Sequence, residues 1–323
     1  MRKVISKNTI IILCAILVMV LWGSLFPFVK WGFLEFGISS NNVPDVLLFA
    51  GLRFLISGVI LTIISSFFVK KSELVEELKN KKTIFAIVMV GMFSVILHYS
   101  CSYVALTKTD SSSIALLKQS GVLVFVCFSF LFIKEDKFSI KKVIAALLGV
   151  ASIIVVNLES VNFIMNLGTT LAVASSLCTV ISSIILKKYL SKINPCFITG
   201  LSQFVGGMVL TIIGLSLGGS LSTFTTTGLM ISIYIIIATI VSYGLWYAIV
   251  QRYDLSKLFI IKMLEPLFAC LFSAMLPIGA VLKWNHLVSL IFVGLAIAIC
   301  NFKPKEKKIN LNEEGFAYES NVS

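Results

Sequence analysis

The sequence predicts an all-α integral membrane protein with ten transmembrane helices, arranged as two inverted five-helix repeats. Three observations predict this fold class. The 323 residues are 58% hydrophobic and 13% charged, with a mean hydropathy of +1.01, whereas soluble domains carry about a quarter charged residues. Apolar runs long enough to cross about 30 Å of hydrocarbon follow one another along the chain. The two halves of the sequence also resemble each other when the chain is shifted by 144 residues.

The apolar runs are predicted to be helices rather than strands, because they are continuous and show no period-two alternation. Short polar residues that can cap free amide groups precede three of them: Asp110, Asn194-Pro195 and Asp254. The first run is too long for a signal peptide and has no small-residue cleavage site, so we expect it to be retained. In order, the predicted helices are 9–30, 45–69, 83–106, 111–133, 139–157, 166–186, 195–216, 228–250, 255–277 and 285–302.

The distribution of basic residues predicts the orientation in the membrane, since cationic loops stay on the cytoplasmic side. Alternate connections and the two termini together hold 21 of the 27 Lys and Arg residues. We therefore expect both termini in the cytoplasm and a multi-pass location in the cytoplasmic (plasma) membrane. The net charge of +12 then needs no nucleic-acid partner. The expected units are a first repeat at 1–157, a second repeat at 158–302 and a polar cytoplasmic tail at 303–323.

The internal repeat is supported by polar residues, which shared hydrophobicity does not explain. A weaker echo at an offset of 150 pairs Arg53-Phe54 with Gln203-Phe204. Five helices per half is an odd number, so the halves cross the membrane in opposite senses, as in the inverted repeats of secondary transporters. The polar matches at the offset of 144, found without a gap, are Tyr99 with Tyr243, Tyr103 with Tyr247, Asp110 with Asp254, and Lys118 with Lys262.

A set of short motifs recurs in order along the chain: Trp22-Gly23-Ser24 with Lys30 closing the first helix, Arg53-Phe54, Tyr103-Val104-Ala105-Leu106 leading to Thr109-Asp110, and Glu265-Pro266. In these motifs, residues 9–302 resemble the ten-helix EamA-type branch of the drug/metabolite transporter superfamily. The resemblance implies secondary transport of small molecules by alternating access. It also implies that helices 1 to 4 and 6 to 9 enclose the substrate, while helices 5 and 10 support the bundle or form a homodimer contact.

Lys118 and Lys262 are the strongest candidates for substrate binding. A lysine within a membrane-spanning helix costs about 2.5 to 3.5 kcal/mol, so we expect each to face a partner or a wet cavity, and the repeat directs both toward one central space. The alternative is that each side chain extends to the membrane surface. Plastid sugar-phosphate translocators, distant members of the superfamily that the chain resembles, hold phosphate with basic residues on helices four and nine. That likeness implies an anionic substrate.

Three further ionisable residues lie within predicted helices. Glu265 follows Lys262 by three residues, so it can form an ion pair with it; alternatively, it couples protons or contacts the amino group of a zwitterionic substrate. His98 is a candidate pH-sensitive group of the cavity, or else a packing residue. Arg53 has no sequence-local partner, and we assign it a gating or structural role.

Aromatic and amide side chains complete the predicted lining. Tyr99 and Tyr243 can offer hydroxyl groups to a substrate, and Trp22 and Gln203 are added to the same lining. We assign gating or structural roles to Tyr103 and Tyr247, which alternatively belong to the aromatic belt at the membrane surface.

The sequence thus predicts a secondary transporter of small polar metabolites, with an anionic or zwitterionic substrate (carboxylate, amino-acid-like or phosphorylated) near Lys118 and Lys262. One alternative is export of cationic or lipophilic compounds, disfavoured because three intramembrane cations face one carboxylate. Another is a membrane-embedded sensor or enzyme, but no nucleotide-binding loop or catalytic set of side chains occurs. The seven cysteines form no C-x-x-C pair. We therefore expect no enzyme activity, cofactor or metal, and only the substrate and the lipid bilayer as partners besides the possible homodimer.

Overall fold

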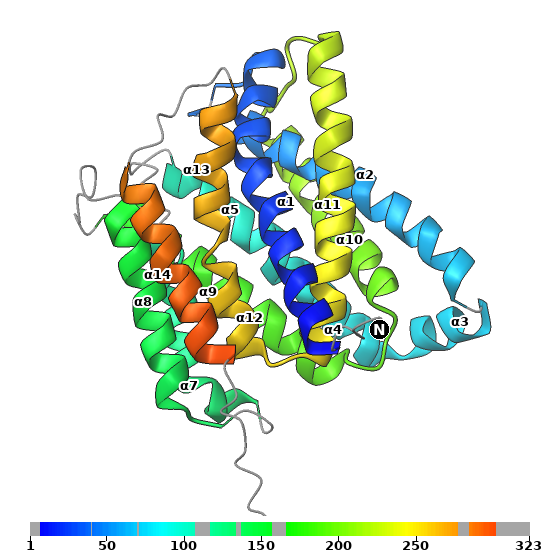
Figure 1. Cartoon of the computed structure of the whole chain (residues 1–323). Coiled ribbons are helices and arrows are strands. Elements are labelled where there is room, and N and C mark those ends of the chain that lie inside the picture. Colours follow the sequence, from blue (N-terminus) through cyan, green and yellow to red (C-terminus); the bar gives the residue numbers. More distant parts are fainter. Residues whose placement is uncertain are drawn as a thin grey trace, which may run out of the picture.

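The structure, a computed structural model, describes residues 7–39, 41–69, 71–106, 117–133, 137–156, 166–276 and 284–301. These residues form a bundle of helices with no strand among them (Figure 1). The helices are α1 (Lys7–Glu35), α2 (Val43–Phe68), α3 (Lys71–Lys79), α4 (Lys81–Gly91), η1 (Met92–Leu97), α5 (His98–Leu106), α7 (Ser120–Phe132), α8 (Ile140–Val156), α9 (Leu167–Tyr189), α10 (Pro195–Ser216), α11 (Thr226–Arg252), α12 (Leu255–Lys262), α13 (Glu265–Met275) and α14 (Trp284–Asn301).

Seven helical runs in the described part are long and apolar enough to cross a membrane: α1, α2, α4 with η1 and α5, α9, α10, α11, and α12 with α13. This finding supports a multi-pass membrane protein. The predicted helices at 111–133, 139–157 and 285–302 correspond to α7, α8 and α14, but ten crossings remain a prediction, as do the unit boundaries. The polar tail at 303–323 lies outside the described residues.

The observed helix ends agree with the predicted caps where these can be seen. The Asn194 side chain accepts hydrogen bonds from the amides of Cys196 and Phe197 at the start of α10. Asp254 does the same for the second and third residues of α12. Such caps satisfy amide groups that have no partner within the helix. Asp110 lies outside the described residues, and α1 continues to Glu35, past the expected end at Lys30.

Helices α2 and α10 touch backbone to backbone through alternating glycines. A methyl group added to Gly207 would lie 2.2 Å from the amide nitrogen of Leu55, and one added to Gly58 would lie 2.2 Å from that of Phe204. Later residues of α2 meet earlier residues of α10, so the two helices are antiparallel. They are the second spanning helices of their halves, and their opposite course agrees with an inverted repeat.

Two predicted helices are interrupted at corresponding places, and the expectation of continuous helices was wrong there. Helix α12 ends at Lys262, and a turn of Met263 and Leu264 precedes α13. In the first half, Lys118 and Gln119 form a turn before α7 begins at Ser120. A break of this kind frees backbone groups that must find other partners inside a membrane. Discontinuous helices are also the places where secondary transporters bind their substrates.

Candidate substrate-binding site

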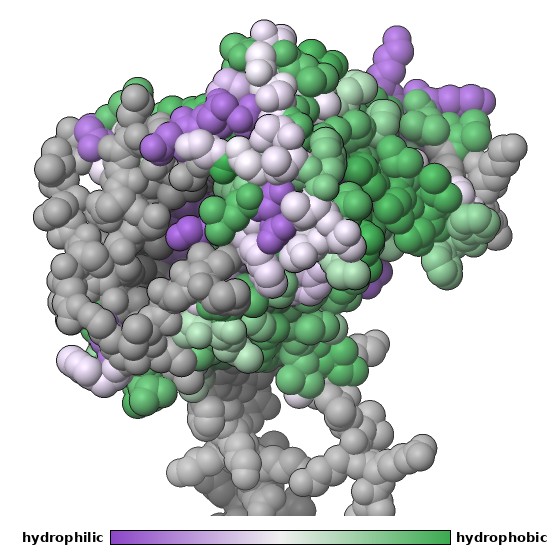
Figure 2. All heavy atoms as spheres, turned by 90° about the horizontal axis from the view of Figure 1, so that it is seen from above, coloured by the Kyte–Doolittle hydropathy of each residue, from purple (hydrophilic) through white to green (hydrophobic). Residues whose placement is uncertain are grey.

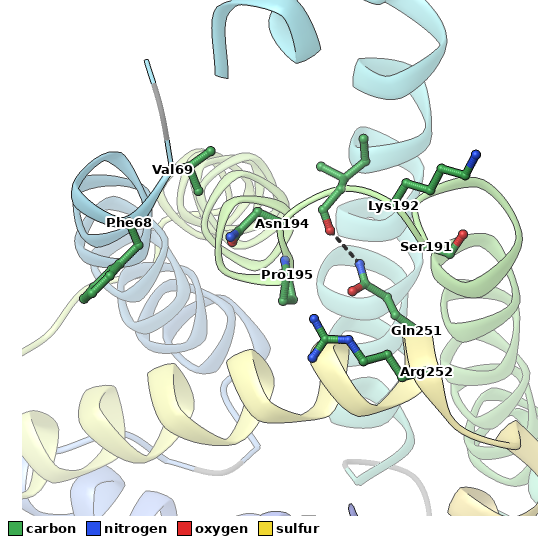
Figure 3. A pocket seen from close by; sticks show the side chains of 9 residues that line it. Phe68, Val69, Ser191, Lys192, Asn194, Pro195, Gln251 and Arg252 are labelled. Carbon is green, nitrogen blue, oxygen red and sulfur yellow. Dashed lines mark hydrogen bonds between the residues drawn. The ribbon is translucent and has the colours of Figure 1, made fainter. Parts of the chain in front are cut away.

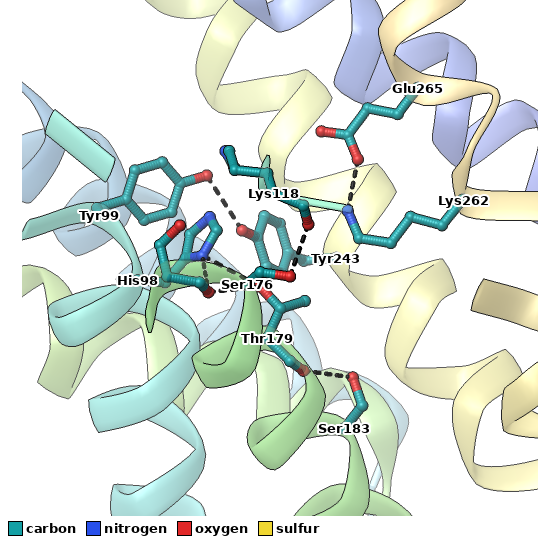
Figure 4. A network of polar contacts seen from close by, with 10 residues as sticks. His98, Tyr99, Lys118, Ser176, Thr179, Ser183, Tyr243, Lys262 and Glu265 are labelled. Atoms are coloured by element: carbon teal, nitrogen blue, oxygen red, sulfur yellow. Dashed lines mark hydrogen bonds and ion pairs between the residues drawn. The ribbon is translucent and has the colours of Figure 1, made fainter. Parts of the chain in front are cut away.

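The breaks bring the two predicted lysines to the same face of α1. The Lys262 Nζ atom lies 4.9 Å from the centre of the Trp22 ring, and the Lys118 Nζ atom lies 5.6 Å from that of Phe26. Trp22 and Phe26 are one helical turn apart, so they lie on one side of α1. The two ammonium groups therefore occupy one region of the bundle, where Figure 4 shows both side chains.

The two lysines differ in their counter-charges. Lys262 forms an ion pair with Glu265, with 2.5 Å between Nζ and Oε2, and both side chains are largely buried at 14% and 13% exposure. The ion pair expected from their spacing is therefore present. Lys118 has a ring contact with Phe26 but no carboxylate within ion-pair distance in the described ranges. Lys262 therefore has a counter-ion within ion-pair distance, and Lys118 has none in the described ranges.

The side chain of Ser176 in α9 forms hydrogen bonds with two backbone groups at the helix break beside Lys118. Its hydroxyl donates a hydrogen bond to the Lys118 carbonyl at 2.6 Å and accepts one from the Gly121 amide at 2.9 Å. A side chain at position 121 would lie 2.4 Å from this hydroxyl, so glycine allows the approach. Beside the second helix break, Gly23 of α1 allows α13 to approach closely, since a methyl group at position 23 would lie 2.4 Å from the Phe268 Cβ atom.

The two repeat-related tyrosines meet directly. The hydroxyl groups of Tyr99 and Tyr243 are 3.2 Å apart (Figure 4), and these residues are separated by the repeat offset of 144. The Tyr243 ring packs against Trp22 with 5.3 Å between ring centres. The indole Nε1 of Trp22 is buried and has no hydrogen-bond partner within the described ranges. The structure thus joins three predicted lining residues into one aromatic wall that leads to Lys262.

His98 is anchored to α9 by one ring nitrogen. Its Nδ1 atom lies 2.9 Å from the Ser175 carbonyl oxygen and 3.0 Å from the Thr179 hydroxyl oxygen. Because a carbonyl can only accept, Nδ1 donates to Ser175, and Nε2 remains available as an acceptor. That second nitrogen points toward the pair Tyr99 and Tyr243 (Figure 4).

Arg53 and Gln203 are buried near the wall, and several of their polar atoms have no hydrogen-bond partner among the described residues. The Arg53 guanidinium lies 4.3 Å from the centre of the Phe54 ring and 5.2 Å from that of Tyr99. Its Nε and Nη2 atoms lack acceptors among the described residues. Gln203 is completely buried, and there its Nε2 has no acceptor and its Oε1 no donor. The structure therefore brings Arg53 to Tyr99, whereas no hydrogen bond joins Gln203 to the lysines.

The other two tyrosines lie behind the wall. Tyr247 is only 3% exposed, and its hydroxyl lies 3.1 Å from that of Ser94, so it does not belong to an aromatic belt at the membrane surface. The Tyr103 ring packs against Tyr99 at 5.6 Å between centres. Sequence reasoning missed Ser176, Thr179 and Phe26. The signal for Ser176 was weak, namely a serine on one helix and Ser120-Gly121 on another.

Comparisons with known proteins agree with this architecture. The uncharacterized transporter YvbV of Bacillus subtilis (strain 168) is 24% identical over 321 residues, covering 97% of this chain and 99% of that protein. A solved crystal structure that is 15% identical matches with a TM-score of 0.75 over 92% of this chain and 97% of the other, which shows a common fold. The sequence model of the EamA-like transporter family matches residues 9–158 and again residues 166–302. Since these two matches span most of the sequence, the chain belongs to the EamA-like transporter family, within the drug/metabolite transporter superfamily.

Proposed function

We propose that the protein is a secondary transporter that moves a small anionic or zwitterionic metabolite by alternating access, with the substrate held near Lys118 and Lys262. The observation that carries this proposal is the contrast between the two lysines. Lys262 has Glu265 as a counter-ion, whereas the Lys118 ammonium group lies over the Phe26 ring and has no carboxylate within ion-pair distance in the described ranges. An unpaired ammonium group within a membrane is costly, and a negatively charged substrate would supply the missing partner.

The surrounding groups favour an anion over a cation. Arg53 adds a third positive charge close to the wall. Trp22 adds a buried indole donor that has no acceptor in the part of the chain that the structure describes. A cationic substrate would meet these charges with Glu265 already engaged. Export of cationic compounds is therefore the weaker candidate.

The anion proposal can be tested by ligand-induced stabilisation and by transport. Purified protein is screened for thermal stabilisation by carboxylates, amino acids and phosphate esters, and hits are tested for counterflow in proteoliposomes. We expect Lys118→Gln to abolish the stabilisation and counterflow, and Lys118→Arg to retain part of both because it keeps the charge. Lys137→Gln serves as the control, because Lys137 is an exposed residue that precedes α8 in the chain. Stabilisation that survives Lys118→Gln and Lys262→Gln unchanged would contradict the proposed site.

Glu265 distinguishes a simple anion from a zwitterion. In Glu265→Gln, Lys262 loses its counter-ion, so a carboxylate or phosphate ester should bind more tightly than to the unmodified protein. A zwitterion whose amino group contacts Glu265 should instead bind more weakly. Dissociation constants for one dicarboxylate and one amino acid among the hits, measured side by side, decide between these two substrate classes. Equal affinities before and after the substitution would remove Glu265 from the site.

A further inference from the structure

A pocket of about 310 Å³ lies at the end of the bundle where four helices begin or end, away from the two lysines of the candidate site. Its wall is formed by the last residues of α2, the connection from α9 to α10, and the end of α11 (Figure 3). The runs α2, α9, α10 and α11 are all long and apolar enough to span a membrane. The pocket is therefore at the level where the bilayer meets water. Its volume is at the lower end of the range of about 300 to 1,000 Å³ for small-molecule sites.

The charged groups of the pocket are both positive. Lys192 and Arg252 line it and are exposed, and neither forms an ion pair with any described residue. No Asp or Glu is among its lining residues. A ligand with a negative charge and no positive charge matches this lining.

Two amide side chains add directed hydrogen-bonding groups. Gln251 is fixed because its Nε2 donates to the carbonyl oxygens of Leu190 at 2.8 Å and Ile193 at 3.0 Å. Its Oε1 remains as an acceptor that faces the pocket (Figure 3). Asn194 uses its Oδ1 to cap α10, which leaves its Nδ2 as a donor. The pocket thus offers donors to an anionic oxygen and one acceptor to a hydroxyl group.

An apolar track leads from the pocket along α2. Ile56, Val59, Ile63 and Phe67 are 43%, 39%, 54% and 79% exposed, and their spacing places them on one face of the helix. With a rise of 1.5 Å per residue, this face is about 16 Å long, comparable to an acyl chain. Phe68, next to the last residue of the track, is itself part of the pocket wall.

We propose that this pocket binds the headgroup of an anionic phospholipid of the phosphatidylglycerol type, with an acyl chain along the exposed face of α2. The phosphate contacts Arg252, Lys192 and the Nδ2 of Asn194, and a glycerol hydroxyl donates to the Oε1 of Gln251. Phosphatidylcholine fits less well, because its quaternary ammonium finds no acidic group in the lining. Basic pockets between membrane-spanning helices are suited to acidic headgroups.

The test measures lipid binding by native mass spectrometry on the purified full-length protein. The variant Lys192→Gln/Arg252→Gln is compared with Lys137→Gln/Lys141→Gln, which removes two exposed lysines at the start of α8, outside the pocket. We expect about thirtyfold weaker binding of phosphatidylglycerol in the pocket variant, from the loss of two cations near the bilayer surface. Binding to the control variant should change less than threefold, and phosphatidylcholine binding should be unaffected in both.

Three outcomes would overturn the proposal. Equal losses in the two double variants would mean that phosphatidylglycerol responds to the overall positive charge and not to the pocket. Binding of sn-glycerol 3-phosphate that is as tight as that of the lipid, and lost in the same variant, would assign the pocket to a soluble phosphate ester. Unchanged binding in the single variant Lys192→Glu, which reverses a charge on an exposed residue, would also contradict it. These outcomes are independent of the transported substrate.

Discussion

Replacing glycine with alanine should have opposite effects at Gly207, in the contact between α2 and α10, and at Gly244 of α11, outside that contact. In Gly207→Ala, the new methyl group would lie 2.2 Å from the Leu55 nitrogen and 2.7 Å from the Phe54 carbonyl carbon, whereas favourable contacts between carbon atoms are at about 3.5 to 4.0 Å. The helices must separate by roughly 1 Å, at a cost of about 1 to 3 kcal/mol. In Gly244→Ala, the methyl group would meet no atom within 4 Å among the described residues, apart from the neighbouring backbone of its own helix. The higher helix propensity of alanine therefore stabilises this variant by up to about 1 kcal/mol.

The free energy of unfolding is measured for both variants in mixed micelles, by titration with dodecyl sulfate and tryptophan fluorescence. The expected difference in the free energy of unfolding is about 1 to 4 kcal/mol, the sum of the two opposite effects. Since both substitutions replace glycine with alanine within a membrane-spanning helix, their unfolded states are matched. Equal stabilities, or a Gly207→Ala variant as stable as the unmodified protein, would refute the backbone contact between α2 and α10.

Two further predictions concern hydroxyl groups. Ser176→Ala should destabilise the protein by about 1 to 3 kcal/mol, because the Lys118 carbonyl and the Gly121 amide lose their hydrogen-bond partner. Ser175→Ala should change stability by less than about 0.5 kcal/mol, since that hydroxyl bonds only within its own helix; comparable losses in the two would contradict the bridge. Tyr99→Phe and Tyr243→Phe should each cost about 0.5 to 1.5 kcal/mol, and the double variant should cost no more than the larger single loss. If the loss of stability in the double variant equals the sum of the two single losses, the two hydroxyl groups do not interact.

Hydropathy was sufficient to predict most of the helices, because a bilayer demands long apolar segments wherever the chain crosses it. The prediction for α10 matches its observed bounds. Helix α3 was not predicted, since it is short and polar and gives no hydropathy signal. The turn after Lys118 was also missed, because its stability depends on Ser176, a residue 58 positions away that sequence reading does not connect to it.

The grouping of the candidate site residues was predictable where those residues recur in both halves of the sequence. Lys118 and Lys262 were recognised because polar residues at one offset are improbable by chance, and both lie at the helix breaks beside α1. The ion pair with Glu265 followed from helix geometry. The anchoring of His98 on α9 could not be derived, since it depends on a carbonyl group, which every residue carries. Likewise, the burial of two Arg53 nitrogens without partners among the described residues depends on how the helices pack, which composition does not show.

The hydroxyl pair of Tyr99 and Tyr243 has a geometric consequence for the alternating-access cycle that we propose. When each half of an inverted repeat adopts the shape of the other, most residues exchange surroundings with their counterparts and their contacts are replaced. Two counterparts that touch each other straddle the rotation axis, so the exchange maps their contact onto itself. Inward-facing and outward-facing forms related in this way would share this junction, and probes placed on the two rings would report a constant separation while distances elsewhere change.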